Sequence, residues 1–144
     1  MNHAFSMIDL GLLSQFWGLD IYQSNIEIKV NHSNYASYLL KNFIMKDFNP
    51  SKTPFLSGAK LEEAQLTPLE NNTLYRLPVG CLLYLTHTRH DISYVVIVPS
   101  RHMDQPHDIH WMATKIILNF VQGTKTHGIH YVAQSMEQPN PIVR

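Results

Sequence analysis

The stretch LYLTHTRHDISY, residues 83–94, holds the densest group of side chains in this sequence that could do chemistry. Two histidines, Arg89 and Asp91 lie between two apolar segments, and imidazole and carboxylate groups together bind metals or transfer protons. A structural explanation competes with catalysis, because Thr88 and Asp91 stand three residues apart just before an apolar run. This spacing is typical of a capping box, in which two side chains bond free backbone N–H groups at a helix start. The spacing favours Thr88 and Asp91 as a helix cap and leaves Arg89 for another role.

Histidines also occur in pairs three residues apart, which on a helix lie on one face and can chelate zinc. The three pairs are His87 with His90, His107 with His110, and His127 with His130. The H-E-x-x-H pattern with its glutamate base is absent, and two of the pairs fall at expected element boundaries, where polar side chains are common. We therefore expect solvated surface histidines and no bound metal. A histidine zinc site stays an alternative, which zinc in the purified protein would reveal.

Nucleic-acid enzymes that use two metal ions need clustered carboxylates to hold them. The aspartates here are scattered along the chain, as Asp9, Asp20, Asp47, Asp91, Asp104 and Asp108. The one acidic doublet, Glu62-Glu63, lies in an expected loop. The single cysteine, Cys81, lies in an apolar stretch where a thiol serves packing, and no G-x-S-x-G or phosphate-binding glycine loop is present. The residues therefore predict a fold without an active site of its own and without a bound cofactor.

The composition predicts one modest domain with a real core. The chain has 144 residues, 44% of them hydrophobic, and its 11 basic residues equal its 11 acidic residues. Proteins that hold a phosphate backbone usually carry a basic excess, so any nucleic-acid contact here depends on local patches. No apolar run reaches about 18 residues and the start lacks a secretory pattern, so we expect an intracellular protein without a membrane partner, its compartment left open.

The hydrophobic pattern predicts an α+β fold that begins with a β-hairpin. Apolar and β-branched residues alternate on both sides of a polar turn at 24–25, which predicts two strands. Residues 33–46 place apolar side chains at helical spacing, and the prolines and glycine of 48–67 predict a long loop. After a mainly helical region, residues 128–132 are expected to form a short closing strand, followed by a frayed tail.

Further helices are expected between the loop and the closing strand. Residues 67–68, a threonine and a proline, have the pattern of a helix start. Pro78 is expected to make this helix begin afresh, because proline removes a helical hydrogen bond. Pro99 is expected to end or kink the next helix. Apolar residues from Ile109 to Val121 repeat at three- and four-residue spacing and are followed by a glycine stop.

Aromatic and basic side chains are the residues that could grip nucleic acid by stacking on bases and by meeting phosphates. The aromatic candidates are Phe16, Trp17 and Tyr22, and the basic ones are Lys41, Lys46, Arg76, Arg89, Arg101 and Lys115. From composition alone, core aromatics and an ordinary charged surface are the favoured interpretation.

Several ordered blocks of this sequence nevertheless resemble one family. The blocks are FSMIDLGLLSQFWGLDI, PSKTP, YRLPVGCLLYLTHTRHDISYVV, SRHMDQPHDIHW and NFVQGTKTHGIHY. Together they resemble the second half of the reverse transcriptase in copia-type retrotransposon polyproteins, from about Phe5 to Tyr131. The resemblance is specific because several blocks agree in the same order.

The resemblance implies three parts. Residues 1–32 would be a palm-edge segment with a primer-grip-like hairpin, residues 33–122 a helical region like the thumb and connection, and residues 123–144 a closing strand and tail that lead toward a ribonuclease H domain. The family's catalytic Tyr-x-Asp-Asp motif, which binds magnesium, would lie upstream and is not in this chain. We therefore expect RNA-directed DNA polymerisation of the parent enzyme and none of this chain alone.

The resemblance also implies which residues touch nucleic acid. Phe16, Trp17 and Gly18 would help to position the primer strand of a primer–template duplex. Arg89 and Lys115 would face that duplex. The missing palm and ribonuclease H regions would be the protein partners of the chain in the intact enzyme.

Departures from the family point toward a weakened element. Ile116, Asn119 and Gln122 stand where the family typically carries arginine or lysine, and each lost cation removes a phosphate contact. His90 stands where the family has proline. These changes favour a relic of a broken retrotransposon. The alternative is a retained module that binds nucleic acid or protein without chemistry.

Overall fold

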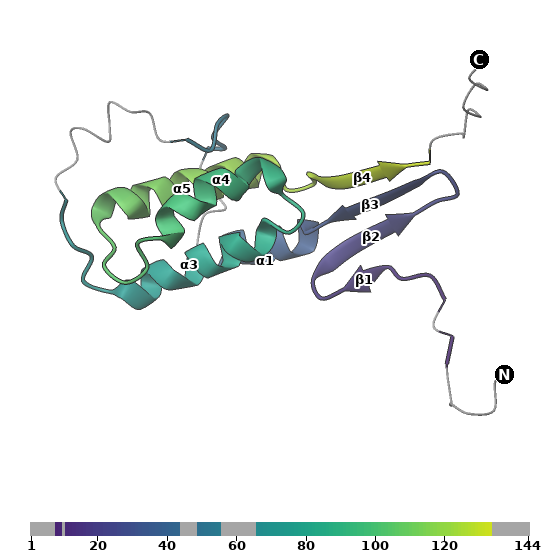
Figure 1. Ribbon diagram of the computed structural model, residues 1–144, viewed down its shortest axis with the longest axis horizontal. Coiled ribbons are helices and arrows are strands. Elements are labelled where there is room, and N and C mark those ends of the chain that lie inside the picture. The colour runs from purple at the N-terminus through teal and green to yellow at the C-terminus, as the bar shows by residue number, and fades with distance from the viewer. Residues whose placement is uncertain (1–7, 10, 44–48, 56–65, 134–144) are drawn as a thin grey trace, which may run out of the picture.

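The computed structural model describes residues 8–9, 11–43, 49–55 and 66–133, which form an elongated α+β arrangement (Figure 1). A four-stranded sheet lies at one end, and the helices pack together at the other. The strands are β1 (Gln15–Phe16), β2 (Leu19–Gln23), β3 (Glu27–Asn31) and β4 (Gly128–Val132). The helices are α1 (Ser33–Asn42), α3 (Asn72–Leu85), α4 (His90–Ser100) and α5 (Asp108–Gly123). The predicted order of hairpin, helical region and closing strand is confirmed.

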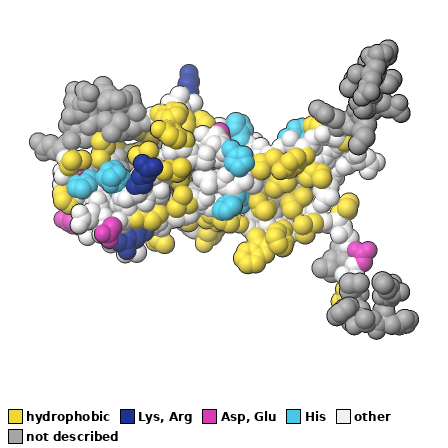
Figure 2. Space-filling model, viewed as in Figure 1, with side chains coloured by type: hydrophobic (Ala, Val, Ile, Leu, Met, Phe, Trp, Pro, Cys, Tyr) yellow, Lys and Arg dark blue, Asp and Glu magenta, His cyan; other side chains and the backbone are white. Residues whose placement is uncertain are grey.

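The sheet is antiparallel in the order β1-β2-β3-β4, so the closing strand β4 pairs with β3, the last of the three N-terminal strands. Ile21, Val30 and Ile129 are register partners, and Ile28 pairs with Tyr131 on the same face because side chains alternate along a strand. We call these five residues the apolar sheet face. Ile28 is 40% and Tyr131 58% exposed, and Figure 2 shows hydrophobic side chains gathered over this end of the molecule.

The hydrophobic core lies among the four described helices. Its buried residues recur at three- and four-residue spacing, as amphipathic helices require. They are Ala36, Leu39, Leu40, Leu82, Leu85, Ile92, Val95, Val96, Ile117, Leu118 and Val121. Burying one such side chain contributes roughly 1.5–3 kcal/mol, so this cluster supplies most of the fold's stability. Cys81 packs against it, as expected of a thiol that serves packing.

Helix α3 begins later than the sequence predicts. Its N-cap is Asn71, whose side-chain oxygen accepts hydrogen bonds from two backbone N–H groups of the first turn at 3.0 and 3.3 Å. Thr67 and Pro68 precede the helix, and Pro68 instead forms an isolated β-bridge with His107. The predicted start at 67–68 is therefore wrong, because asparagine caps a helix well and Pro68 pairs across the chain.

The prolines affect the helices less than predicted. Pro78 lies inside α3, which continues through it, so the predicted restart there is wrong. Its ring is buried, and packing of the apolar face offsets the one missing hydrogen bond. Pro99 comes one residue before the end of α4, as predicted. The predicted helix over 33–46 is confirmed as far as Asn42. Residues 44–46, most of the loop 48–67 and the tail from 134 lie outside the described residues.

Helix α5 confirms the clearest helical pattern of the sequence, and a histidine closes its first turn. The Nδ1 atom of His110 accepts a hydrogen bond from the backbone N–H of His107 at 3.0 Å. The His102 ring stacks on His110 with centroids 3.8 Å apart. Burial, with the nearby His102 and His107, lowers the pKa of His110 from 6.5 to about 4. His110 is therefore neutral in the fold at neutral pH.

We predict that acid weakens the fold through His110. Between pH 6.5 and about 4 the unfolded chain binds a proton at this residue that the folded chain does not, so stability falls as the pH drops through that window. The His110→Asn variant keeps an acceptor for the His107 N–H and does not titrate. Urea unfolding at pH 7 and pH 5 should show a larger loss of stability in the parent than in His110→Asn. Equal losses would contradict the prediction.

Candidate nucleic-acid interface

The tip of the β1–β2 hairpin is a two-residue turn of Trp17 and Gly18, between the paired residues Phe16 and Leu19. The backbone φ is +52° at Trp17 and +80° at Gly18, as in the type I′ turns that join twisted strands tightly. The sequence pattern predicted a single strand here, and this turn divides it. Trp17 is the one non-glycine residue with positive φ in the described part of the chain. A tryptophan in this conformation is strained, and such strain is found at functional sites.

Tyr84 of α3 anchors this tip to the helical region. Its hydroxyl donates a hydrogen bond to the backbone carbonyl of Trp17, and its ring lies against Gly18. The rings of His32 and Tyr35 pack edge-on against Tyr84, with centroids 4.8 and 4.9 Å away. These contacts leave the Trp17 side chain 79% exposed and Phe16 52% exposed. The hairpin thus presents two aromatic side chains on a fixed backbone.

A buried aspartate supports the same hairpin from behind. Asp20 of β2 is 3% exposed and accepts hydrogen bonds from the backbone and side chain of Asn34 at 3.0 and 2.6 Å and from Gln15 at 3.2 Å. Burial raises the pKa of Asp20, but the hydrogen bonds from Asn34 and Gln15 outweigh it, so the pKa lies below its usual value. The sequence analysis noted Asp20 only as one of the scattered aspartates. Nothing in the sequence around Asp20 indicated that its side chain would be buried and would bond Asn34 at the start of α1.

Arg89 is a structural residue and does not face outward. It is 3% exposed, and its guanidinium donates two hydrogen bonds to the Asp91 carboxylate at 2.9 and 2.8 Å. It also donates to the backbone carbonyl and hydroxyl of Thr124, at 2.9 and 2.8 Å, and lies 5.8 Å from the Phe120 ring centroid. The expectation that Arg89 faces a duplex is therefore wrong, because its donors are used to join the start of α4 to the end of α5.

The predicted helix cap is also corrected. The N-cap of α4 is Arg89, without a side-chain cap hydrogen bond, and the Thr88 hydroxyl lies 2.7 Å from Nδ1 of the buried His32. Asp91 does lie in the first turn of α4, where a carboxylate favours the helix dipole. Hydrogen bonds from Arg89 hold the pKa of Asp91 below its usual value. Thr88 and Asp91 therefore do not form a capping box. They belong to the joint between α3 and α4, where Thr88 pairs with His32 and Asp91 pairs with Arg89.

Lys115 is exposed on α5, and its Nζ atom lies 5.3 Å from the centroid of the Trp111 ring, one turn earlier on the same helix. That Lys115 meets a duplex stays a prediction. On the face in Figure 2, lysine and arginine lie over the helical half, and the side chains over the sheet are mostly hydrophobic. The hairpin therefore offers stacking surface more than positive charge.

Histidines of the three spaced pairs bond to the protein itself. His87 Nδ1 lies 2.7 Å from the Tyr84 carbonyl, and His130 Nε2 lies 2.6 Å from the Glu27 carboxylate, while His110 closes the first turn of α5. Among the described residues, no group of three or more histidine, cysteine, aspartate or glutamate side chains is placed to hold a metal ion. None of the helices in the same residues is long and apolar enough to cross a membrane.

Comparisons with known proteins agree on one family. The retrovirus-related Pol polyprotein from transposon RE2 of Arabidopsis thaliana is 34% identical over 129 residues, which are 90% of this chain and 9% of the polyprotein. An uncharacterised mitochondrial protein of Arabidopsis thaliana is 34% identical over 131 residues, 90% of this chain and 54% of that protein. A putative transposon Ty5-1 protein of Saccharomyces cerevisiae is 32% identical over 133 residues, 91% of this chain and 43% of that protein. Over about nine tenths of its length, the chain is similar to copia-type retrotransposon Pol polyproteins.

The chain spans about half the length, or less, of the relatives that it matches. No protein-family model and no solved structure matches it significantly. The family resemblance that the sequence blocks carried is confirmed over most of the chain, and so is the α+β fold.

We predict that Gly18 cannot be replaced without loss of stability. A Cβ at Gly18 would lie in ordinary contact with Tyr84, but φ is +80°, where an L side chain costs about 1–2 kcal/mol. Gly80 in α3 is the matched control, because nothing lies within 4 Å of its added Cβ and alanine favours a helix by roughly 0.5–1 kcal/mol. Urea unfolding should show Gly18→Ala to be less stable and Gly80→Ala more stable than the parent. Two changes of the same sign would contradict the turn geometry.

We also predict a structural effect for Arg89→Gln. The variant leaves Asp91 and Thr124 without the guanidinium donor, and such a loss of hydrogen bonds costs about 1–3 kcal/mol. Arg101→Gln, at an exposed arginine just after α4, should change the unfolding free energy by less than about 0.5 kcal/mol. Chemical unfolding of both variants makes the comparison. A parent-like stability for Arg89→Gln would mean that its side chain is free, as the family resemblance had implied.

Proposed function

We propose that this chain is a non-catalytic part of a copia-type reverse transcriptase and that its β1–β2 hairpin contacts the primer strand of a primer–template duplex. The observation that carries the proposal is Trp17, a 79% exposed indole on a strained turn that Tyr84 anchors. Stacking of one base on an aromatic side chain contributes about 1–3 kcal/mol and tolerates any sequence. A grip on a primer needs this tolerance, because every sequence must pass through it.

The chain alone is proposed to lack polymerase activity. Polymerisation requires carboxylates clustered around magnesium ions, and the Tyr-x-Asp-Asp motif does not occur in this sequence. Two of the described aspartates are engaged elsewhere, since Asp20 bonds Asn34 and Asp91 bonds Arg89. Magnesium would belong to the parent enzyme. In a cell, such a fragment would act where nucleic acid lies, which is an intracellular setting.

Binding by the isolated chain should be weak and sensitive to salt. The net charge is zero and Arg89 is buried, so Lys115 is the remaining residue that the family resemblance places against the duplex. Weak binding without chemistry would suit a relic, and it would equally suit a retained binding module.

The apolar sheet face supports the proposed protein partners. Its Ile28 and Tyr131 side chains are exposed, and an exposed apolar area is typical of an interface. We assign it to contact with the other segments of the parent polyprotein, the palm above all. Their absence would leave the chain prone to aggregation.

The prediction for the hairpin uses Trp17→Asn. Asparagine followed by glycine favours a type I′ turn, so this variant keeps the hairpin and removes the indole. Fluorescence anisotropy with a labelled primer–template duplex at low salt should show at least fivefold weaker binding than that of the parent, about 1 kcal/mol. Tyr94→Ala removes an aromatic side chain of α4 that is 73% exposed, and it should leave the affinity unchanged.

The same samples test the absence of chemistry. With magnesium and nucleotides added, the primer should stay unextended. Binding that is equal in the parent and in Trp17→Asn would remove the hairpin from the proposal. No binding at low salt would exclude the retained binding module and leave the interpretation of a relic.

A further inference from the structure

A pocket lies at the end of the helical region away from the sheet, between the start of α3 and the start of α5 (Figure 1). Its volume is about 420 Å³, within the usual range of small-ligand sites. The lining residues that matter here are Leu69, Glu70, Leu74, Tyr75, Asp108 and Trp111. The hairpin takes no part in it, and Lys115 is not among its lining residues.

The floor of the pocket is aromatic and held in place. Tyr75 is 1% exposed, and its hydroxyl donates to the Pro99 carbonyl at 2.7 Å, so the ring cannot swing away. The Trp111 indole meets Tyr75 edge-on, with centroids 6.5 Å apart. The Lys115 ammonium 5.3 Å from the Trp111 centroid indicates that this ring already attracts a cation.

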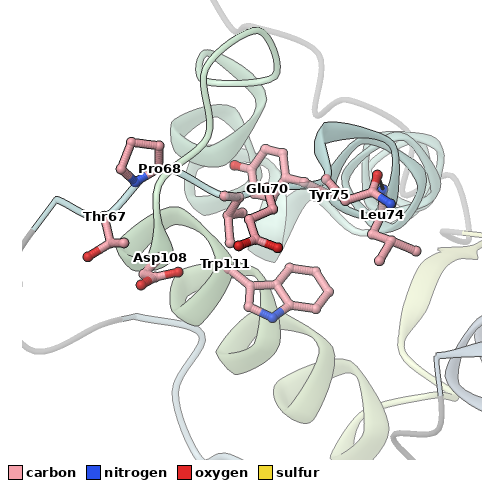
Figure 3. Close-up of a pocket in the computed structure, with 9 residues that line it drawn as sticks. Thr67, Pro68, Glu70, Leu74, Tyr75, Asp108 and Trp111 are labelled. Carbon is pink, nitrogen blue, oxygen red and sulfur yellow. Dashed lines mark hydrogen bonds between the residues drawn. The ribbon is translucent and has the colours of Figure 1, made fainter.

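The rim of the pocket is acidic. Figure 3 shows the Glu70 carboxylate pointing toward the Trp111 indole, with Asp108 beside Thr67 at the other end of the pocket. Neither carboxylate forms an ion pair within the part of the chain that the structure describes, and the pocket has no lysine or arginine in its lining. By contrast, the exposed carboxylate of Asp104 forms an ion pair with Arg76. Two carboxylates and an indole therefore face a space whose lining has no lysine or arginine, and the Lys115 ammonium near the Trp111 ring lies outside that lining.

We propose that this pocket binds an arginine side chain presented by a partner peptide. A guanidinium stacks flat on an indole and donates to carboxylates, while its methylene groups suit the apolar contact that Leu69 and Leu74 offer. The acidic rim repels phosphate, so nucleic acid is excluded as the occupant. The site adds a protein-binding role at the opposite end from the hairpin, and it does not depend on the proposed grip on the primer.

The test follows the indole N–H signals by NMR. The chain has two tryptophans, so two such signals are expected, and Trp17→Asn assigns them. The probe is the blocked tripeptide Gly-Arg-Gly, and the same peptide with citrulline, the neutral isostere of arginine, is its control. The Trp111 signal should shift to saturation with the arginine peptide, while the Trp17 signal stays in place. A citrulline peptide that binds equally well would overturn the proposal.

Matched variants separate a built site from general attraction of charge. Glu70→Gln should weaken the arginine peptide at least fivefold, and Glu70→Gln with Asp108→Asn more than tenfold. Asp104→Asn removes the same charge from a 96% exposed carboxylate outside the pocket lining and should leave the affinity unchanged. An equal loss in Asp104→Asn, or no loss in Glu70→Gln, would overturn the proposal. Because Asp108 also stabilises the first turn of α5, the single Glu70→Gln variant decides the outcome if the double variant melts early.

Discussion

The sheet of this protein forms a single layer, and its position depends on the polar and aromatic contacts that fasten one end of it to the helical core. A small sheet needs a hydrophobic face packed on another element, and here Ile28 and Tyr131 of the apolar sheet face are exposed to solvent. Asp20 bonds the start of α1, His32 meets Thr88 between α3 and α4, and Tyr84 holds the Trp17 carbonyl. These three attachments place the hairpin tip at a fixed distance from the helices.

The joint between α3 and α4 explains why so many polar residues gather in one short stretch. Thr88 turns toward the sheet, while Arg89 turns toward Asp91 and the end of α5. Taking a guanidinium out of water is costly unless its donors are satisfied, and here four hydrogen bonds to two residues do so. The residues that looked suited to catalysis therefore join α4 to the end of α5 and to His32 at the end of the sheet. The charges of Arg89 and Asp91 are paired with each other.

The sequence predicted what periodicity controls and missed what distant partners control. Helix α5 and β4 follow from local spacing, and the hairpin follows from alternation around a polar turn. The burial of Arg89 does not, because its partner Thr124 lies 35 residues away and nothing local announces it. The start of α3 was misplaced because threonine with proline and Asn71 are both plausible caps, and only the pairing of Pro68 with His107 decides between them.

The position of the candidate site could be predicted only through the family. Phe16 and Trp17 are residue types that usually lie in a core. Their exposure to solvent follows only from the turn between β1 and β2. The positive φ at Trp17 could not be predicted locally either. Glycine at position 18 predicts a turn, but it does not indicate that the tryptophan before it also has a positive φ.

The two ends of the molecule carry different chemistry, and this difference argues for different partners. The sheet end presents exposed apolar side chains and an exposed indole, and the charge of Lys29 there is paired with Glu27 at the surface. The far end presents carboxylates around a buried aromatic floor. At the stacking end, salt would weaken the phosphate contact while leaving the stacking itself largely unchanged, because stacking releases no counterions. At the acidic end, salt would weaken the charge attraction that carries recognition. The two ends therefore suit partners of different chemistry, which bind without competing for the same surface.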